Sequence, residues 1–500
     1  MAVAFDAVVV GSGPNGLAAA VTCARAGLTV LVLEGQATAG GGSRTLDLGL
    51  APALVHDLCS AVHPLAVLSP FLREFDLAAR GVASTAPEVS YAHPLDGAPA
   101  GLAWHDLDRA CAGLGPDGEA WRVLFGRLAG HAPEAAALAL GDKRSLPPEL
   151  GHSPGPGLPT AASLAATATS AGTPALGAVL RTRAARALLT GVAAHTIARL
   201  PSLAGGGTAA LLGAAAHGPG WPIVHGGSQA IADALLADLA AHGGSLELGS
   251  PVASRADLPP ALAYLFDTSA DGAVRILGDA LPPRVRRGLG RLGHGAAAAK
   301  VDFVLSGPVP WADPQVARAG TVHLGGDAAD LRANAARVAA GRLPELPTTL
   351  VSDPATFDAG RQVGGLRPLW AYAHVPFGCP ADVTERVSAQ LERFAPGFRD
   401  LVVAARCVPA DRMADHNANL VGGDIAAGTV DAWRLVARPR AALDPYALGV
   451  PGMYLCSAAT PPGPGVHGMG GWFAARRALA QRFGIARPPA LGPHPTAPAR

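Results

Sequence analysis

The first 45 residues combine two apolar runs with a helical pattern between them. The run from Ala7 to Val10 indicates a buried strand of a parallel sheet. From about Pro14 to Ala26 the residues predict a helix, with proline in its first turn and Gly27 placed for a left-handed C-terminal cap. A second apolar run, Thr29 to Leu33, predicts the next strand, and it ends on Glu34. The pattern therefore predicts a strand–helix–strand unit.

The turn between the first strand and the helix has the spacing of a dinucleotide-binding loop. It consists of Gly11, Ser12, Gly13, Pro14, Asn15 and Gly16. Gly11 permits the tight turn, Gly13 lets the backbone approach a pyrophosphate, and Gly16 lets the helix pack on the sheet. The N–H groups at the helix start face the phosphates. Glu34 is placed to bind an adenosine ribose. The alternative is a glycine-rich turn that binds nothing.

The chain continues with a second glycine-rich stretch that a nicotinamide-binding unit does not need. It includes Gly41, Gly42, Ser43, Arg44 and Thr45. This stretch resembles the G-G-x-x-R-[ST] sequence of flavoproteins of the amine oxidase and phytoene desaturase superfamily. Glycines let the backbone pass beside a flat cofactor, and Arg44 can offer a planar fork to it. The alternative for Arg44 is a surface ion pair.

A third glycine-rich stretch lies near the C-terminus. A predicted strand, Met453 to Cys456, precedes it, and a predicted helix follows from about Trp472 to Phe483. The segment resembles the closing motif of phytoene desaturase-like flavoproteins. Through that resemblance, the residues expected to contact FAD here are Ser457, Ala458, Gly465, Val466, His467, Gly468 and Met469. N–H groups at the helix start can stabilise the negative charge that builds on a flavin carbonyl as the ring takes a hydride.

The middle of the chain completes an α/β fold with a second domain. A helix over Ala230–His242 and strands over Ser245–Leu248 and Leu262–Phe266 return the chain to the first sheet. By resemblance, Val252 contacts the adenine; its alternative is ordinary sheet packing. The hairpin that relatives carry between those strands is nearly absent. Further strands are expected at 300–305, 321–324, 349–351 and 369–375, and helices at 118–130, 181–195 and 381–394, the second of which would cover the substrate space. The strands predict an antiparallel or mixed sheet as the floor of the second domain.

We therefore predict a Rossmann-like FAD-binding domain of the glutathione reductase/amine oxidase type with a discontinuous α+β substrate domain. The FAD-binding domain takes residues 1–75, 215–275 and 441–487, the substrate domain takes 76–214 and 276–440, and 488–500 form a proline-rich tail. For residues 131–180, loop and loosely packed helices stay open as alternatives. Gly325 and Gly326 lack the spacing of a second nucleotide site, so no dedicated NADPH domain is expected.

Composition narrows the class of protein further. The 500 residues carry a formal charge of +1 without a basic tract, which makes nucleic acid an unexpected partner. The six cysteines show no C-x-x-C spacing, so we expect reduced thiols in a cytoplasmic protein and no redox-active pair beside the flavin. Asp6 and the glycines break the apolar N-terminus, which is not expected to be a signal peptide or membrane span. Oligomeric state and contact with a membrane surface stay open.

Several phrases, among them "HDLCSAVHPLA", "HNANLVGGDIA" and "YLCSAATPPGPGVHGMGGW", resemble the phytoene desaturase-like branch of FAD-dependent oxidoreductases. The group they are most similar to is called pyridine nucleotide-disulphide oxidoreductase domain-containing protein 2. The resemblance implies hydride transfer between a largely apolar small molecule and flavin N5, with oxygen or a quinone as acceptor. A redox-neutral isomerase, a saturase using reduced FAD and a non-catalytic flavin-binding protein are the alternatives. An amine oxidase is less favoured, because only 5% of residues are aromatic and no cage for an amine is apparent.

Two histidines are candidate general bases. His467 is the first, because its motif is expected beside the flavin, and His56 is the second. For both histidines, the alternative interpretation is a purely structural role. For His56, Asp57 and His63, helix capping and satisfied core polarity are the favoured interpretation. No metal site is expected.

Overall fold

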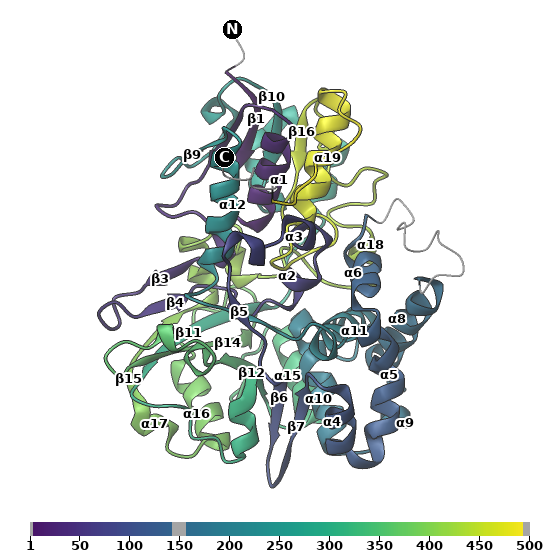
Figure 1. The fold of residues 1–500 in the computed structure, drawn as a ribbon, viewed down its shortest axis with the longest axis vertical. Coiled ribbons are helices and arrows are strands. Elements are labelled where there is room, and N and C mark those ends of the chain that lie inside the picture. Colours follow the sequence, from purple (N-terminus) through teal and green to yellow (C-terminus); the bar gives the residue numbers. More distant parts are fainter. Residues whose placement is uncertain (1–3, 143–156, 494–500) are drawn as a thin grey trace, which may run out of the picture.

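The computed structural model describes residues 4–142 and 157–493. It has two lobes (Figure 1). The upper lobe in this view is built on a parallel sheet that contains both the first strand and the last. The lower lobe contains a larger mixed sheet on one side and a group of helices on the other.

The parallel sheet has five strands in the order β16-β10-β1-β2-β9. Every pair in it is parallel. The strands are β1 (Phe5–Val10), β2 (Val30–Leu33), β9 (Ser245–Glu247), β10 (Ala261–Phe266) and β16 (Met453–Leu455). Three segments that lie far apart in the sequence thus form one sheet, and the predicted Rossmann-like fold is confirmed.

The side chains of β2 point alternately to the two faces of this sheet, and different helices cover each face. Val30 and Val32 pack into the core formed with α1 (Pro14–Arg25), α12 (Gln229–Ala241) and α19 (Met469–Arg482). Leu31 and Leu33 face the opposite side, where the core includes residues of α13 (Ala270–Leu277) and α14 (Pro283–Gly290). This two-sided burial explains why the strands are continuous apolar runs.

The second sheet has seven strands in the order β15-β11-β14-β13-β12-β6-β7. Its β12–β6 pair is parallel and the other pairs are antiparallel, so the sheet is mixed. The strands are β6 (Val89–Leu95), β7 (Ala98–Trp104), β11 (Ala297–Leu305), β12 (Ala319–Leu324), β13 (Thr349–Ser352), β14 (Arg367–Val375) and β15 (Val402–Val408). Strands β11, β12, β13 and β14 overlap the strands predicted from the sequence, and β15 was not predicted.

The two faces of this sheet differ in chemistry. Val301, Phe303 and Leu305 of β11 belong to an apolar core that includes side chains of α16 (Thr384–Phe394). The alternate residues Lys300 and Asp302 point to the other face, since side chains alternate along a strand. The expected alternation from Lys300 onward is therefore confirmed, and it gives the sheet one apolar and one polar face.

Helices and short strands complete the structure. The helices expected at 118–130 and 181–195 are present as α5 (Gly118–Gly130) and α10 (Arg183–Ala193). The described parts of 131–180 contain α6 (Ala132–Leu140), α8 (Gly157–Gly172) and α9 (Leu176–Val179), and residues 143–156 lie outside the described chain. The remaining α-helices are α2 (Pro64–Leu68), α3 (Pro70–Phe75), α4 (Leu107–Gly113), α11 (Leu203–His217), α15 (Ala328–Ala339), α17 (Phe398–Leu401) and α18 (Ala432–Val436). Two small antiparallel pairs join β3 (Thr45–Asp47) to β4 (Val55–Asp57) and β5 (Ser84–Thr85) to β8 (Ile223–Val224).

Two helix starts differ from the sequence prediction by three residues. The last helix begins at Met469, three residues before the expected Trp472, because Gly468 takes a left-handed conformation with φ 68° and starts the helix there. Helix α16 begins at Thr384 instead of Ala381, with Val383 as its N-cap residue.

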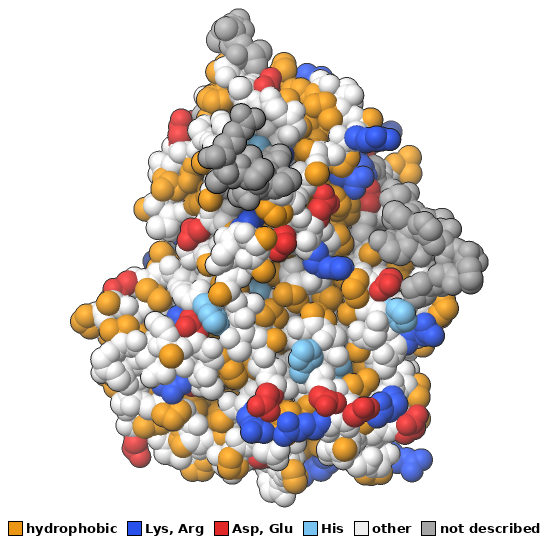
Figure 2. Space-filling model, viewed as in Figure 1, with side chains coloured by type: hydrophobic (Ala, Val, Ile, Leu, Met, Phe, Trp, Pro, Cys, Tyr) orange, Lys and Arg blue, Asp and Glu red, His pale blue; other side chains and the backbone are white. Residues whose placement is uncertain are grey.

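The surface carries charges of both signs. On the face in Figure 2, blue and red side chains are interspersed across the lower lobe. In the described parts of the chain, no helix is long and apolar enough to cross a membrane. The six cysteines are free thiols, and Cys23, Cys111 and Cys456 are buried.

Candidate cofactor and active site

The glycine-rich turns from the two ends of the chain lie against each other. The first turn of α19 packs on the first turn of α1, so closely that a Cβ at Gly471 would lie 1.7 Å from the backbone oxygen of Asn15. Gly41 approaches the same loop, because its Cβ would lie 2.8 Å from Cα of Gly13. Within the loop, a Cβ at Gly16 would lie 2.1 Å from the oxygen of Gly11, which itself has φ 101°. Only glycine permits these three approaches.

Glu34 is held in a fixed position at the end of β2. Its Oε2 accepts hydrogen bonds from Ser12 N (2.9 Å) and Ser12 Oγ (2.5 Å), and Oε1 accepts one from Gln36 N (2.9 Å). Glu34 as a whole residue is 9% exposed. This is the position that a ribose-binding acid needs next to the glycine loop.

Arg44 is buried rather than paired on the surface. Its Nε donates to the oxygen of Gly41 (3.0 Å), Nη1 donates to Thr38 Oγ1 (3.3 Å), and Nη2 donates to the carbonyl of His416. Burial lowers the pKa of the guanidinium, while Cys59 and Glu34 act to raise it. Arg44 therefore joins the second glycine stretch to the loop at 410–420.

The residues beside Arg44 have structural partners. Thr45 Oγ1 donates to Asp57 Oδ1 (2.6 Å), which also accepts from Ser228 N (2.9 Å), while Arg361 Nη1 donates to Asp57 Oδ2 (3.0 Å). Burial alone would raise the pKa of Asp57, but Arg361 and these hydrogen bonds hold it below its usual value. Ser43 is fully buried. Asp57 is thus a buried connection between β4, α12 and the second domain.

His467 stabilises its own loop. Its Nδ1 accepts a hydrogen bond from Met469 N (3.1 Å), so Nε2 carries the proton and donates to the oxygen of Gly463 (3.1 Å). Ser69 Oγ donates to the carbonyl of His467 (2.5 Å). Burial lowers the pKa of the imidazole to about 4, which keeps it neutral near pH 7. Both ring nitrogens are engaged, and a catalytic role for His467 stays a prediction.

The other candidate positions lie around the same turns. Pro14 and Gly42 are partly exposed, as are Ala458 and Val466, and Gly465 is exposed. Ser457 is buried, and its Oγ accepts from Ala459 N (3.2 Å) while its carbonyl accepts from Thr460 Oγ1 (2.7 Å). Val252 lines a cavity of about 410 Å³ together with Leu33 and Ser250, on the sheet face opposite α1. That cavity lies where the hairpin is shortened.

A second group of polar residues gathers around Asp302 of β11, and of these residues only His56 was a candidate from the sequence. Lys300 Nζ donates to Asp302, and His56 Nδ1 lies 3.6 Å from Asp302 Oδ1. The Lys300 ammonium also lies 5.4 Å from the centre of the Trp370 ring, within the range of a cation–π contact. All four side chains are buried. The available signal was the pair of charges two positions apart in an otherwise apolar strand.

His56 differs from its neighbours in this group. The alternative of satisfied core polarity holds for Asp57. His63 Nε2 lies 2.8 Å from Ser228 Oγ, while its Nδ1 has no hydrogen-bond partner among the described residues. Among the described residues, neither ring nitrogen of His56 has a hydrogen-bond partner. A buried histidine with a free lone pair beside a carboxylate has the geometry of a general base.

Aromatic and neutral side chains extend the polar face of the second sheet. In the register, Tyr372 lies opposite Lys300, and Trp370 lies opposite Asp302. The two rings meet edge to face with centroids 5.2 Å apart. Burial lowers the pKa of His374 to about 4 and that of His195 to about 3, so both are neutral at pH 7. The buried charges of Lys300 and Asp302 balance each other.

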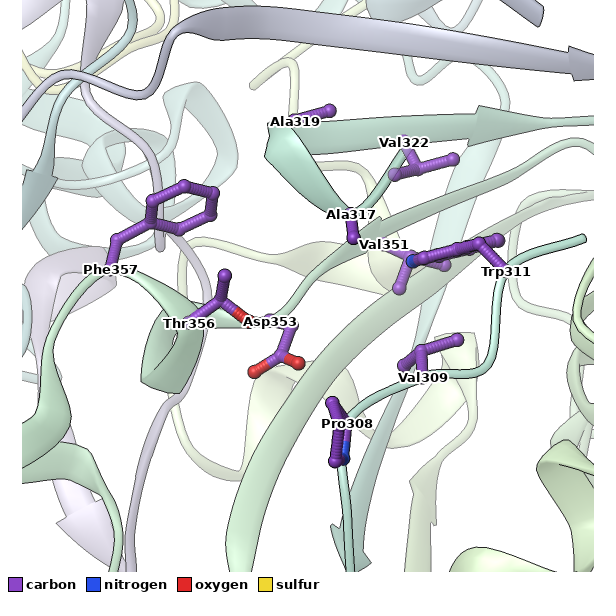
Figure 3. Close-up of a pocket in the computed structure, with 10 residues that line it drawn as sticks. All are labelled: Pro308, Val309, Trp311, Ala317, Ala319, Val322, Val351, Asp353, Thr356 and Phe357. Carbon is purple, nitrogen blue, oxygen red and sulfur yellow. The ribbon is translucent and has the colours of Figure 1, made fainter. Parts of the chain in front are cut away.

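A small cavity lies on the other face of the second sheet. Its volume is about 30 Å³, and Val322, Val351 and Asp353 are among its lining residues (Figure 3). Val322 and Val351 belong to the apolar core on the side away from Trp370. A space of this size holds about one water molecule, so it is too small for a substrate.

Comparison with known proteins supports the fold. A model described as an NAD(P)-binding Rossmann-like domain matches residues 9–75. Putrescine oxidase bound to putrescine is similar over 97% of this chain and 99% of its own, with 17% identity and a TM-score of 0.61. An oxidoreductase from Methanosarcina mazei is similar over 94% of this chain and 100% of its own, with 15% identity and a TM-score of 0.56. Cyclohexylamine oxidase from Brevibacterium oxydans is similar over 97% of this chain and 100% of its own, with 15% identity and a TM-score of 0.54. A search of curated protein sequences gives no match. The chain has the fold of amine oxidase-type flavoproteins.

The residues at the meeting point of the turns fit FAD in their chemistry. The helix starts of α1 and α19 supply backbone N–H groups, Glu34 supplies a carboxylate for ribose hydroxyls, and Arg44 supplies a cation. The close approach of Gly41 to Gly13 brings the loop expected beside the flavin onto the phosphate loop. One side chain, Asp267, adds a carboxyl group where phosphates are expected. No group of three or more metal-ligating side chains occurs in the described ranges.

Proposed function

We propose that this chain is a FAD-dependent oxidoreductase of the phytoene desaturase-like type that acts on a largely apolar substrate. Bound FAD supplies the hydride acceptor, and oxygen or a quinone takes the electrons afterwards. The observation that carries the substrate class is the face of the second sheet around Trp370 and Tyr372. It is aromatic and buried, and its buried charges Lys300 and Asp302 are paired with each other.

An apolar substrate suits this face for a physical reason. An isolated charge on the substrate would lose its hydration there and find no free partner, because Lys300 and Asp302 are bound to each other. The imidazoles of His195 and His374 are neutral and offer only hydrogen bonds. Polyene- or lipid-like molecules lose little on entering such surroundings and gain by burying apolar area.

We assign the proton transfer to His56. Its imidazole can accept a proton from the substrate. The proton comes from the carbon next to the one that loses hydride, or from a hydroxyl on the carbon that loses hydride. Asp302, 3.6 Å from Nδ1, stabilises the imidazolium that forms. Lys300 holds Asp302 in place, so Lys300 is a positioning residue. His467 keeps the C-terminal loop in shape through both of its ring nitrogens.

The test is anaerobic bleaching of the FAD-loaded protein by a panel of apolar alkenes, alcohols and amines, with product masses measured. An apolar alkene or alcohol that bleaches the flavin and loses two hydrogens supports the proposal. An unchanged product mass indicates an isomerase, and a gain of two hydrogens with reduced FAD indicates a saturase. Tight FAD binding without bleaching by any compound contradicts an enzymatic function.

Variants locate the chemistry. His56→Gln should slow bleaching about a hundredfold, the range of a lost general base, without weakening FAD binding. Lys300→Met should slow it less, because Asp302 keeps its charge beside His56 but is no longer held by the Lys300 ammonium. Arg406→Met is the matched control, since Arg406 lies opposite Asp302 on β15 but is exposed. Equal rates for His56→Gln and the unaltered protein would contradict the assignment.

An amine is the second candidate substrate class. No aromatic cage is apparent in the sequence, but the fold brings the rings of Trp370 and Tyr372 together, with centroids 5.2 Å apart. The solved structure of putrescine oxidase with putrescine shares this overall fold. An amine would have to enter as the neutral base, because an ammonium ion would lose its hydration here and Asp302 is already paired with Lys300. Bleaching by amines with a rate that rises with pH would favour this class over the apolar one.

A further inference from the structure

Asp267 places a buried carboxyl group inside the glycine loop. It follows β10, is 7% exposed, and its Oδ2 accepts a hydrogen bond from Gly16 N at 2.9 Å. A Cβ at Gly13 would lie only 2.5 Å from this Oδ2, and a Cβ at Gly16 would lie 3.0 Å from it. The glycines of the loop therefore make room for this side chain as well as for a ligand.

The position is unusual for a carboxylate if a dinucleotide is to bind. The N–H groups at the start of α1 are the donors that an anionic pyrophosphate uses. A charged Asp267 would already engage one of these donors and would repel the phosphates through an interior of low dielectric constant. A neutral Asp267 would not repel them, and its O–H could donate a hydrogen bond to a phosphate oxygen.

The surroundings disfavour the charged form. Glu34 approaches from the end of β2, the Cys456 thiol from the end of β16, and α1 contributes the amides of Gly13 and Gly16. Burial and the charge of Glu34 raise the pKa of Asp267 to about 7, against the lowering effect of the two amides. Burial also raises the pKa of Cys456 well above its usual value, so that thiol is neutral. Glu34 is the charged neighbour, and it acts in the same direction as the phosphates.

We propose that Asp267 is a cofactor-binding residue that takes up a proton when the dinucleotide binds, so that the phosphates meet a neutral acid. This inference rests on the proposed binding of FAD. Because one proton is taken up on binding, the affinity for FAD depends on pH. In the pH range where Asp267 of the unbound protein is ionised, each unit of rising pH weakens FAD binding by up to tenfold. Below pH 6 the acid is already protonated, and affinity becomes independent of pH.

The experiment is a calorimetric titration of the apoprotein with FAD at pH 6.0, 7.0, 8.0 and 8.5. We expect the dissociation constant to rise at least tenfold from pH 6.0 to 8.5. Repeating the titration at pH 8.0 in phosphate and in Tris, which differ in ionisation enthalpy, should show uptake of close to one proton per FAD bound. Asp267→Asn keeps an acceptor for Gly16 N without a titratable group, so its affinity should be flat with pH and its proton uptake near zero.

Asp279→Asn is the matched control. It removes the same charge from an exposed side chain and should keep the pH dependence of the unaltered protein. FAD binding by the unaltered protein that is independent of pH, without proton uptake, would overturn the role of Asp267 and leave the proposed function standing. No FAD binding at any pH would overturn both. The proton uptake of the unaltered protein decides the matter even if Asp267→Asn does not fold.

Discussion

The guanidinium of Arg44 donates a hydrogen bond to the backbone carbonyl of His416, a residue 372 positions later in the chain. The imidazole of His416 lies 3.6 Å from the Cys59 sulfur, and the Cys59 carbonyl accepts a hydrogen bond from Trp370 Nε1 at 3.0 Å. These contacts connect the second glycine stretch to the aromatic face of the other sheet. The proposed cofactor site and the proposed substrate face are thereby held in one arrangement.

Replacing Arg44 tests this connection. Arg44→Ala should weaken FAD binding about tenfold to a hundredfold, since a hydrogen bond from a charged donor contributes roughly 1.5–3 kcal/mol. Arg44→Lys should recover only part of the loss, because an ammonium cannot reproduce the planar fork. Fluorescence titration with FAD measures both. Arg73→Ala, which removes an exposed arginine of α3, is the control. An Arg44→Ala affinity equal to that of the control would remove Arg44 from the site.

Asp57 should matter for stability more than for chemistry. Asp57→Asn leaves the buried Arg361 without its carboxylate, which should lower the free energy of unfolding by about 3–5 kcal/mol. Urea unfolding at pH 7 measures this loss, and Asp47→Asn, on the exposed part of the same hairpin, should change little. The pKa of Asp57 is lowered on folding, so its contribution is present above about pH 4 and is lost as the pH falls further. Equal stabilities of the two variants would contradict this account.

The contact between the two helix starts is sensitive to a single methyl group. Gly471→Ala should lower the free energy of unfolding by about 3 kcal/mol or more, because its Cβ would lie 1.7 Å from the Asn15 oxygen and the backbones would have to separate. Gly207→Ala, in α11, is the control. Nothing lies within 4 Å of its added Cβ, and alanine should stabilise the helix by about 0.5–1 kcal/mol. Thermal unfolding of both variants measures these changes. We expect Gly471→Ala to lower the stability and Gly207→Ala to raise it.

Buried neutral histidines predict a loss of stability in mild acid. Burial lowers the pKa of several imidazoles to about 3 or 4: His63, His93, His195, His217, His374 and His467. Between about pH 6.5 and 4 the unfolded chain therefore binds more protons than the folded one, and stability falls as the pH falls. Asp267 acts in the opposite direction, because its pKa is raised on folding, but it is one group against several.

Urea unfolding of the apoprotein at pH 7.5, 6.5, 5.5 and 4.5 measures this dependence. Each buried histidine contributes up to about 1.4 kcal/mol per pH unit within the window. His93→Gln should reduce the slope by about one proton, while His131→Gln, at a partly exposed position, should leave it nearly unchanged. Constant stability across the range would mean that these imidazoles are not buried as described.

The sequence was most informative where structure is local. The strand–helix–strand pattern of residues 5–33 follows from apolar runs, from proline in the first turn and from Gly27, and the structure places β1, α1 and β2 there. The glycine spacing and Glu34 act within 22 residues of each other, so their relation could be predicted from one segment. The alternation around Lys300 predicted a strand correctly for the same reason.

Relationships across the fold were not predictable in this way. Asp267 directly follows a predicted strand, but its contact with Gly16 spans 251 positions and could not be predicted from one segment. Lys300 and Asp302 are recognisable as charges in an apolar strand, but their nearness to His56 depends on how two lobes pack. A content of 5% aromatic residues gave no sign that Trp370 and Tyr372 would lie together. In His467, the motif indicated the place of the side chain but not that both ring nitrogens bind its own loop.

The central claim is that the glycine turns from the two ends of the chain together hold one FAD. Absorbance at 450 nm of the folded protein, after incubation with FAD and removal of unbound nucleotide, tests it most directly. The account predicts one flavin per chain, retained through gel filtration. A folded protein that stays colourless and retains no flavin would contradict it.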